Sequence, residues 1–127
     1  MNKFFPEIKK NFGFGCMRLP EIQHEDGSWE VDQEKTTEML LHAYNPGVNY
    51  FDTAYIYPGN EAAFGEILEK TGLRDRVHIA TKLPHYLIKS RESLEKCFQE
   101  QLRRLRTDHI DYYLMHMLND IEAWNRL

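Results

Sequence analysis

The chain has 127 residues, of which 42% are hydrophobic, and a formal net charge of -4, which suits one domain over residues 1–127 with a core of its own. The acidic balance argues against a nucleic-acid partner, which needs a basic stripe, and no apolar run approaches the roughly 20 residues that cross a bilayer. Cys16 and Cys97 lack metal-binding or redox spacing, and residues 1–6 are too short and polar for a signal peptide, so we expect a cytoplasmic protein with reduced thiols.

The first half of the chain predicts two strands separated by a helix. Residues 11–17 carry aromatic side chains and two glycines, which is typical of a short buried strand. The polar residues 21–30, with an Asp-Gly turn signal, predict a loop. Asp32 is expected to cap a helix over residues 33–44, where apolar positions recur every three or four residues. Residues 48–52 follow as the second strand.

The second half repeats this order. Asn60 is expected to cap a second helix, since asparagine is a favoured N-cap residue. Residues 77–82 predict a third strand. Ser90 begins the helix with the clearest 3.6-residue apolar stripe in the chain. Residues 110–115 predict a fourth strand, and residues 121–127 the opening of another helix.

Four strand-helix units in series, joined by short connections, predict an α/β fold with a parallel sheet. An open doubly wound sheet and part of a (β/α)8 barrel both fit that order. Gly13 and Gly15 lack the third glycine of a dinucleotide-binding G-x-G-x-x-G and run into a loop. We therefore expect the parallel TIM-barrel type, with only about the first four βα units present as a half-barrel.

Titratable side chains stand at the ends of three successive predicted strands. Asp52 closes the second strand, Lys82 closes the third and His116 follows the fourth, with Tyr57 in the loop beyond Asp52. The carboxyl ends of parallel barrel strands form the rim where barrel enzymes place their chemistry, so the four side chains are expected to converge. Lys82, held charged by Asp52, would favour the phenolate of Tyr57 and make it a usable proton donor near neutral pH.

A neutral His116 beside that phenol could hydrogen-bond a substrate oxygen and orient it. This set suits reduction of a carbonyl, in which Tyr57 protonates the oxygen while a cofactor supplies the hydride. The pattern therefore predicts a small-molecule carbonyl substrate.

Five stretches resemble the aldo-keto reductase superfamily, and together they extend over nearly the whole chain. They are residues 13–15, 52–57, 59–61 with Gly65, 80–82 and 108–116. The resemblance implies an oxidoreductase that uses NADPH or NADH to reduce an aldehyde or ketone to an alcohol. It implies a catalytic tetrad of Asp52, Tyr57, Lys82 and His116, with Tyr57 as the proton donor.

The resemblance also places Met17, Arg18 and Asp52 near the nicotinamide side of the cofactor. Residues 15–20 and 79–84 look most like bacterial members that carry an additional C-terminal iron-sulfur domain, although this chain has no cysteine cluster for such a centre. In the family, most groups that hold the rest of the cofactor come from the second half of the barrel.

Two alternatives remain open. A complete barrel of this class needs about 250 residues, so the chain could be a truncated, non-catalytic half-barrel that forms homo-oligomers to cover its open edges. A metal-assisted hydrolase using Asp52, His85 and His116 is the second alternative, but the histidines show no shared ligand spacing and no metal site is predicted.

Three smaller features also have an ordinary structural explanation, such as packing or solvation. Tyr55 and Tyr86 flank the expected mouth, where aromatic residues either line a pocket or simply pack. The basic residues 103–106 are read as a solvated helix end, where cations suit the helix dipole.

Overall fold

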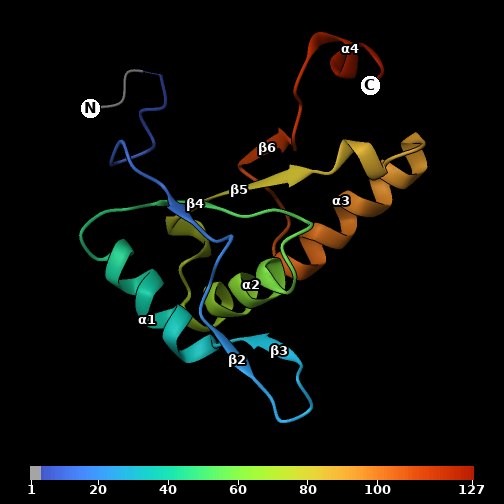
Figure 1. The fold of residues 1–127 in the computed structure, drawn as a ribbon. Helices are drawn as coiled ribbons and strands as arrows, with labels where there is room; N and C mark the ends of the chain where they lie inside the picture. Colours follow the sequence, from blue (N-terminus) through green and yellow to red (C-terminus); the bar gives the residue numbers. More distant parts are fainter. Residues whose placement is uncertain (1–3) are drawn as a thin grey trace.

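The computed structural model describes residues 4–127, so the signal-peptide prediction falls partly on residues outside that range. Figure 1 shows an α/β fold in which a four-stranded sheet is accompanied by a separate two-stranded hairpin. The elements in chain order are β1 (Phe14–Gly15), β2 (Glu21–Gln23), β3 (Trp29–Val31), α1 (Gln33–Tyr44), β4 (Tyr50–Asp52), α2 (Asn60–Thr71), the 3-10 turns at Arg74–Arg76 and His85–Leu87, β5 (His78–Leu83), α3 (Arg91–Leu105), β6 (Tyr112–Met115) and α4 (Ile121–Asn125).

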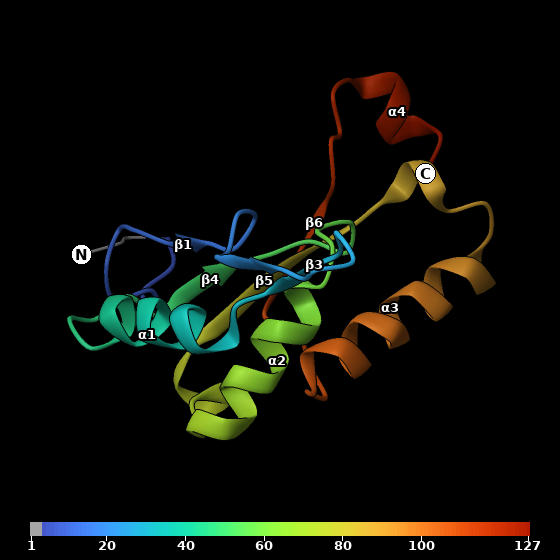
Figure 2. The same ribbon diagram turned by 60° about the horizontal axis from the view of Figure 1, so that its bottom comes forward.

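The four-stranded sheet is wholly parallel and has the order β1-β4-β5-β6, which is the order of the strands along the chain once the hairpin is set aside. Figure 2 shows α1, α2 and α3 on the same side of that sheet. An open doubly wound sheet reverses its strand order at a switch point and carries helices on both faces. A sheet that advances in one direction, with its helices outside, is instead a partial barrel.

The hydrophobic core lies between the sheet and the helices. Phe51 of β4 is buried and its ring lies 5.6 Å from that of Phe64 in α2. Helix α2 approaches α3 closely at Gly65, where an added Cβ would come within 2.7 Å of Leu105 Cα. The absence of a side chain at this position therefore sets how near the two helices can lie.

Two predicted helix starts are confirmed and one is wrong. Asp32 and Ser90 cap α1 and α3 through their side chains, as their positions before apolar-periodic residues indicated. The predicted cap Asn60 is instead the first residue of α2, and Gly59, with a φ of 72°, occupies the N-cap position. The side chain of Asn60 is engaged elsewhere, where it donates hydrogen bonds to the carbonyl oxygens of Cys16 and Met17.

The loop predicted over residues 21–30 is wrong in part, because β2 and β3 pair there as an antiparallel hairpin. Asp26 shapes the turn by accepting hydrogen bonds from the backbone and side chain of Ser28. Each strand has only 3 residues and is mostly exposed, so its polar-apolar alternation is too short to mark a half-buried strand. The first strand is also shorter than the predicted residues 11–17. Over residues 4–127, no helix is both long and apolar enough to span a bilayer.

Candidate functional site

The direction of each strand-end side chain follows from the contacts of its neighbour. Phe51 packs on α2, and the hydroxyl of Thr81 donates to Glu61 in the same helix. Since successive strand residues point to opposite faces, Asp52 and Lys82 project from the face away from the helices. This face corresponds to the interior of a barrel.

Lys82 joins the ends of β4 and β5. Its ammonium Nζ lies 2.7 Å from Asp52 Oδ2 and donates a second hydrogen bond of 2.6 Å to the carbonyl oxygen of Thr53. The two charged side chains are only partly exposed, 13% for Lys82 and 31% for Asp52. Such a charge-assisted contact is stronger than a neutral hydrogen bond and fixes the amine at the rim.

Tyr57 and His116 complete the cluster. Lys82 Nζ lies 5.2 Å from the centroid of the Tyr57 ring, within the range of a cation–π contact. The rings of Tyr57 and His116 meet edge to face, with centroids 5.9 Å apart and planes at 89°. The structure therefore brings together the four side chains expected to converge, hereafter the tetrad of Asp52, Tyr57, Lys82 and His116.

The environment of His116 favours its neutral form. Burial lowers the pKa of its imidazole below the ordinary value, and Lys82 and His85 lower it further, whereas the Asp52 carboxylate acts in the opposite direction. Its Nδ1 atom is buried and has no hydrogen-bond partner within residues 4–127. A neutral imidazole can orient a polar ligand without placing a second full positive charge beside Lys82.

The segment expected near a nicotinamide ring lies beside Asp52. The backbone N–H of Cys16 donates to the carbonyl oxygen of Asp52 over 2.7 Å. Asn60 holds the other side of this segment through the carbonyl oxygens of Cys16 and Met17, while the side chains of Met17 and Arg18 are exposed. Burial raises the pKa of the Cys16 thiol to about 12, so this cysteine is an inert apolar filler.

The two aromatic residues left open by the sequence are now distinguished. The Tyr55 ring packs 4.3 Å from the guanidinium carbon of Arg104, so it belongs to the helix side. Tyr86 is 47% exposed and its ring lies 6.4 Å from that of His116, so it borders the tetrad.

Within residues 4–127, no group of three or more His, Cys, Asp or Glu side chains is arranged to hold a metal ion, which leaves the hydrolase alternative without a ligand set there.

A cluster that the sequence analysis missed lies directly behind the tetrad, on the helix side of β5. We call it the buried network, and its members are Glu61, Thr81, Gln101 and Arg104. The interpretation of residues 103–106 as a merely solvated helix end is wrong for Arg104, which pairs with the fully buried Glu61 at 3.2 Å. One signal was present: Gln101 interrupts the apolar stripe of α3, four residues from both Cys97 and Leu105.

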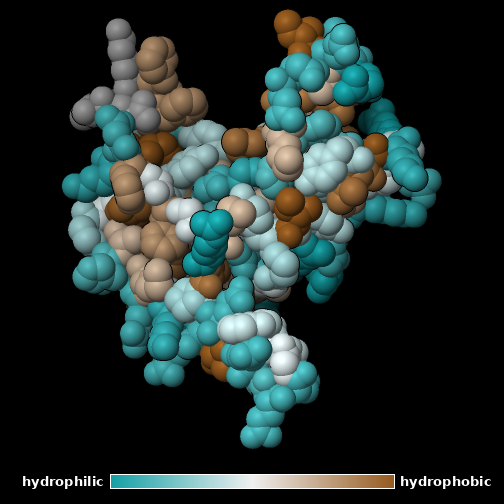
Figure 3. Space-filling model, viewed as in Figure 1, coloured by the Kyte–Doolittle hydropathy of each residue, from teal (hydrophilic) through white to brown (hydrophobic). Residues whose placement is uncertain are grey.

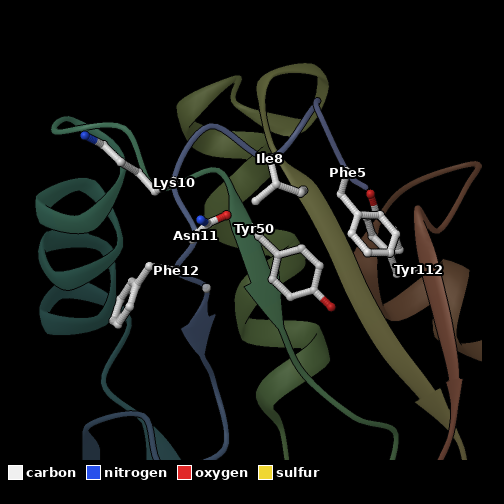
Figure 4. A pocket seen from close by; sticks show the side chains of 8 residues that line it. Phe5, Ile8, Lys10, Asn11, Phe12, Tyr50 and Tyr112 are labelled. Carbon is white, nitrogen blue, oxygen red and sulfur yellow. The ribbon is translucent and has the colours of Figure 1, made fainter. Parts of the chain in front are cut away.

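A pocket of about 360 Å³ opens at the opposite end of the sheet (Figure 4). Its lining residues are Phe5, Ile8, Lys10, Asn11, Phe12, Gly13, Tyr50 and Tyr112. Tyr50 and Tyr112 are the first residues of β4 and β6, so this pocket lies at the amino ends of the strands. Since no member of the tetrad lines it, we do not place the chemistry there.

Comparison with known proteins matches residues 11–122 to the model of the aldo/keto reductase family. An aryl-alcohol dehydrogenase [NADP(+)] of Phanerodontia chrysosporium is 31% identical over 120 residues, and methylglyoxal reductase YeaE of Escherichia coli is 34% identical over 109 residues. Each alignment covers 80% of this chain. A crystal structure of an aldo-keto reductase from Klebsiella pneumoniae in complex with NADPH superposes with a TM-score of 0.66 and 27% identity, covering 91% of this chain.

These relatives are much longer than this chain. The matched region spans 31% of the dehydrogenase, 37% of the methylglyoxal reductase and 40% of the Klebsiella chain. Together with the strand order, this confirms the expected fold type, a (β/α)8 barrel of which about half is present. The particular likeness to members with an iron-sulfur domain stays a prediction.

Proposed function

The chain belongs to the aldo/keto reductase family, and from this premise we propose that it supplies the proton-donating side of an NADPH-dependent reductase of aldehydes or ketones. The observation that carries the proposal is the tetrad: one amine, Lys82, contacts the carboxylate of Asp52 and faces the ring of Tyr57, while His116 meets that ring from the turn after β6. The sequence allowed either NADPH or NADH and identified no individual carbonyl substrate, so the proposal extends to the class of aldehydes and ketones.

In this proposal Tyr57 donates its phenolic proton to the carbonyl oxygen as negative charge develops there. Lys82 stabilises the phenolate left behind, because a positive charge near the ring favours the ionised form. Two of its N–H groups are used by Asp52 and Thr53, which orients the ammonium and leaves its third N–H without a partner among residues 4–127. Asp52 thereby acts by holding the amine in place.

His116 orients the substrate oxygen. Its lowered pKa keeps the imidazole neutral near pH 7, so it can form a hydrogen bond without competing with Tyr57 as a strong acid. With Nδ1 enclosed, Nε2 is the ring nitrogen that a substrate can approach. Tyr86, at the border of the tetrad, helps to exclude water from the reacting oxygen.

A nicotinamide cofactor, when bound, supplies the hydride. The residues of this chain that fit its nicotinamide side are Met17, Arg18 and Asp52, because the first two lie exposed on a segment whose backbone is tied to the third. Asn60 fixes the same segment from α2. The remainder of a cofactor site would come from barrel units beyond the four seen here.

The test is Tyr57→Phe, with Tyr55→Phe as the control two residues away. We expect Tyr57→Phe to lower kcat for reduction of a small aldehyde by about 100-fold or more. NADPH binding, followed by quenching of intrinsic fluorescence, should change less than twofold, whereas Tyr55→Phe should leave turnover intact. Comparable turnover by Tyr57→Phe would remove Tyr57 from its role.

A second candidate is a non-catalytic half-barrel that self-associates. It is favoured by the sheet edges: within residues 4–127, β1 and β6 each pair with one strand only. Figure 3 shows hydrophobic side chains on the C-terminal protrusion. Ile121, the first residue of α4, is 77% exposed. A folded wild-type chain with no NADPH response that elutes as an assembly in size-exclusion chromatography with light scattering supports this candidate. An active monomer contradicts it.

A further inference from the structure

Glu61 is a buried carboxylate for which the tetrad chemistry has no direct use. It stands in the first turn of α2, and its side chain is fully enclosed. Burial raises the pKa of this carboxyl group, while hydrogen bonds from Thr81 and Gln101 and the charge of Arg104 act against that rise. Removing a carboxylate from water is costly, so an apolar side chain would hold α2 against the sheet at least as well. The buried charge of Glu61 therefore indicates a role other than stability.

The partners of Glu61 reach the two chain segments that carry Lys82 and Tyr57. Gln101 donates to Glu61 Oε2 at 3.0 Å and to the backbone carbonyl oxygen of Lys82 at 3.0 Å. On the other side, an Arg104 nitrogen donates to Glu61 Oε1 at 3.2 Å and to the carbonyl oxygen of Tyr55 at 3.0 Å. One carboxylate thus bridges the end of β5 and the loop that leads to Tyr57.

The network is closed at its periphery. Thr81 donates to Glu61 Oε2 at 2.8 Å, and the Tyr113 hydroxyl donates to Gln101 Oε1 at 2.5 Å. Gln101 and Thr81 are completely buried. A fully satisfied polar cluster of this kind admits one arrangement and resists sliding of the segments that it joins.

We propose that Glu61 is a positioning residue, which sets the distance between the Lys82 amine and the Tyr57 ring by holding Gln101 and Arg104. The inference rests on the proposed function, because it concerns the same tetrad. Glu61 touches neither substrate nor cofactor and acts wholly through the backbone of residues 55 and 82. Small displacements of reacting groups are costly, and an error of about 1 Å can lower a rate about 100-fold.

The first arm of the test measures geometry and needs no activity. In the 127-residue chain with isotope-labelled tyrosine and histidine, NMR should show a nuclear Overhauser contact between the rings of Tyr57 and His116. We expect Glu61→Gln to weaken this contact and shift both ring resonances, while the core contact between Phe51 and Phe64 persists. The matched control is Glu100→Gln, which removes the other carboxylate that pairs with Arg104, at 3.2 Å on the surface.

Arg104→Lys provides a second variant if Glu61→Gln does not fold. It retains a positive charge beside Glu61 but lacks the guanidinium that reaches both Glu61 and the carbonyl oxygen of Tyr55. We expect it to reproduce the altered Tyr57 resonances. Unchanged ring contacts in a folded Glu61→Gln or Arg104→Lys chain would overturn the positioning role.

The second arm measures rates. We expect Glu61→Gln to lower kcat for aldehyde reduction about 10- to 100-fold with a KM for NADPH within twofold of wild type, and Glu100→Gln to lower neither. If the wild-type chain shows no turnover, the proposed function fails, whereas the NMR arm still decides whether Glu61 positions Tyr57. If turnover is present and Glu61→Gln leaves kcat and both rings unchanged, only the positioning role fails.

Discussion

Two neighbouring residues of β5 face different chemical environments. Thr81 points toward the helices, where its hydroxyl belongs to a network in which each polar group has a partner. Lys82 points to the opposite face, where it meets Asp52 but where His116 Nδ1 has no partner within residues 4–127. The buried network thus satisfies its own members, whereas the tetrad keeps an N–H of Lys82 without a partner among the described residues, which a ligand can use.

The largest expected effect comes from disrupting the contact between α2 and α3 at Gly65. In Gly65→Ala the new methyl group would come within 2.7 Å of Leu105 Cα and closer to the carbonyl oxygen of Arg104, and neither backbone atom can yield easily. Alanine is a better helix former than glycine by about 1 kcal/mol, but the steric clash costs more than this gain. We therefore expect the free energy of unfolding, measured in urea, to fall by about 3 kcal/mol. Gly15→Ala, which meets no atom within 4 Å, is the control; equal stability of the two variants would contradict the close approach of α2 and α3.

Two buried threonines, one with a hydrogen-bond partner for its hydroxyl and one without, allow the value of such a partner to be measured. Thr81→Val removes a hydroxyl that donates to Glu61, so we expect a loss of about 1–2 kcal/mol in the free energy of unfolding. Thr53 is equally buried, but its hydroxyl oxygen has no hydrogen-bond partner among the described residues. Thr53→Val should therefore be neutral or stabilising by up to about 1 kcal/mol. Denaturant unfolding of both variants measures the difference, and the reverse order would mean that the assignment of partners is wrong.

The smallest effect concerns the pH dependence of stability. Because burial and Lys82 lower the pKa of His116 in the folded chain, the unfolded chain binds a proton more readily between that lowered pKa and about 6.5. The contribution of His116 to the free energy of unfolding therefore rises with pH through this window and is least favourable below it. Asp52 opposes the shift, while His85 adds to it.

His116→Asn should remove this part of the pH dependence. On going from pH 7.5 to pH 5, we expect the wild-type chain to lose more stability than the variant, as measured by urea midpoints at several pH values. The same replacement at His42, on the exposed face of α1, is the control. A variant whose midpoints follow the wild-type curve throughout would contradict the lowered pKa.

Features whose signal lies within a short segment were predicted correctly, and features that depend on distant residues were not. The cap residues Asp32 and Ser90 bond to backbone within three residues, so their patterns are visible in a short window. Asn60 has the same residue preference but is drawn to carbonyl groups more than 40 positions earlier, and its capping role was wrongly predicted for that reason. The β2–β3 hairpin was missed because each strand has only 3 residues, too few for polar-apolar alternation to be recognised.

The tetrad and the buried network differ in the same way, since only the first has a signal within short segments. The tetrad could be anticipated because β4, β5 and β6 each end on a member, next to one or just before one, and a parallel sheet collects strand ends at one rim. Glu61, Gln101 and Arg104 lie on two helices and up to 43 positions apart, so no spacing rule joins them. Only the interruption of the α3 stripe by Gln101 hinted that something polar was buried.

The sequence by itself determined the order of the four sheet strands and of the helices, the parallel half-barrel and the set of residues at its rim, because hydrophobic period, most caps and strand ends are properties of short segments. Tertiary structure alone decided which polar groups are partnered, how closely α2 meets α3 at Gly65 and that a buried carboxylate stands behind Lys82. Those features depend on contacts between side chains distant along the chain, and their energies arise only when packing removes water from both partners.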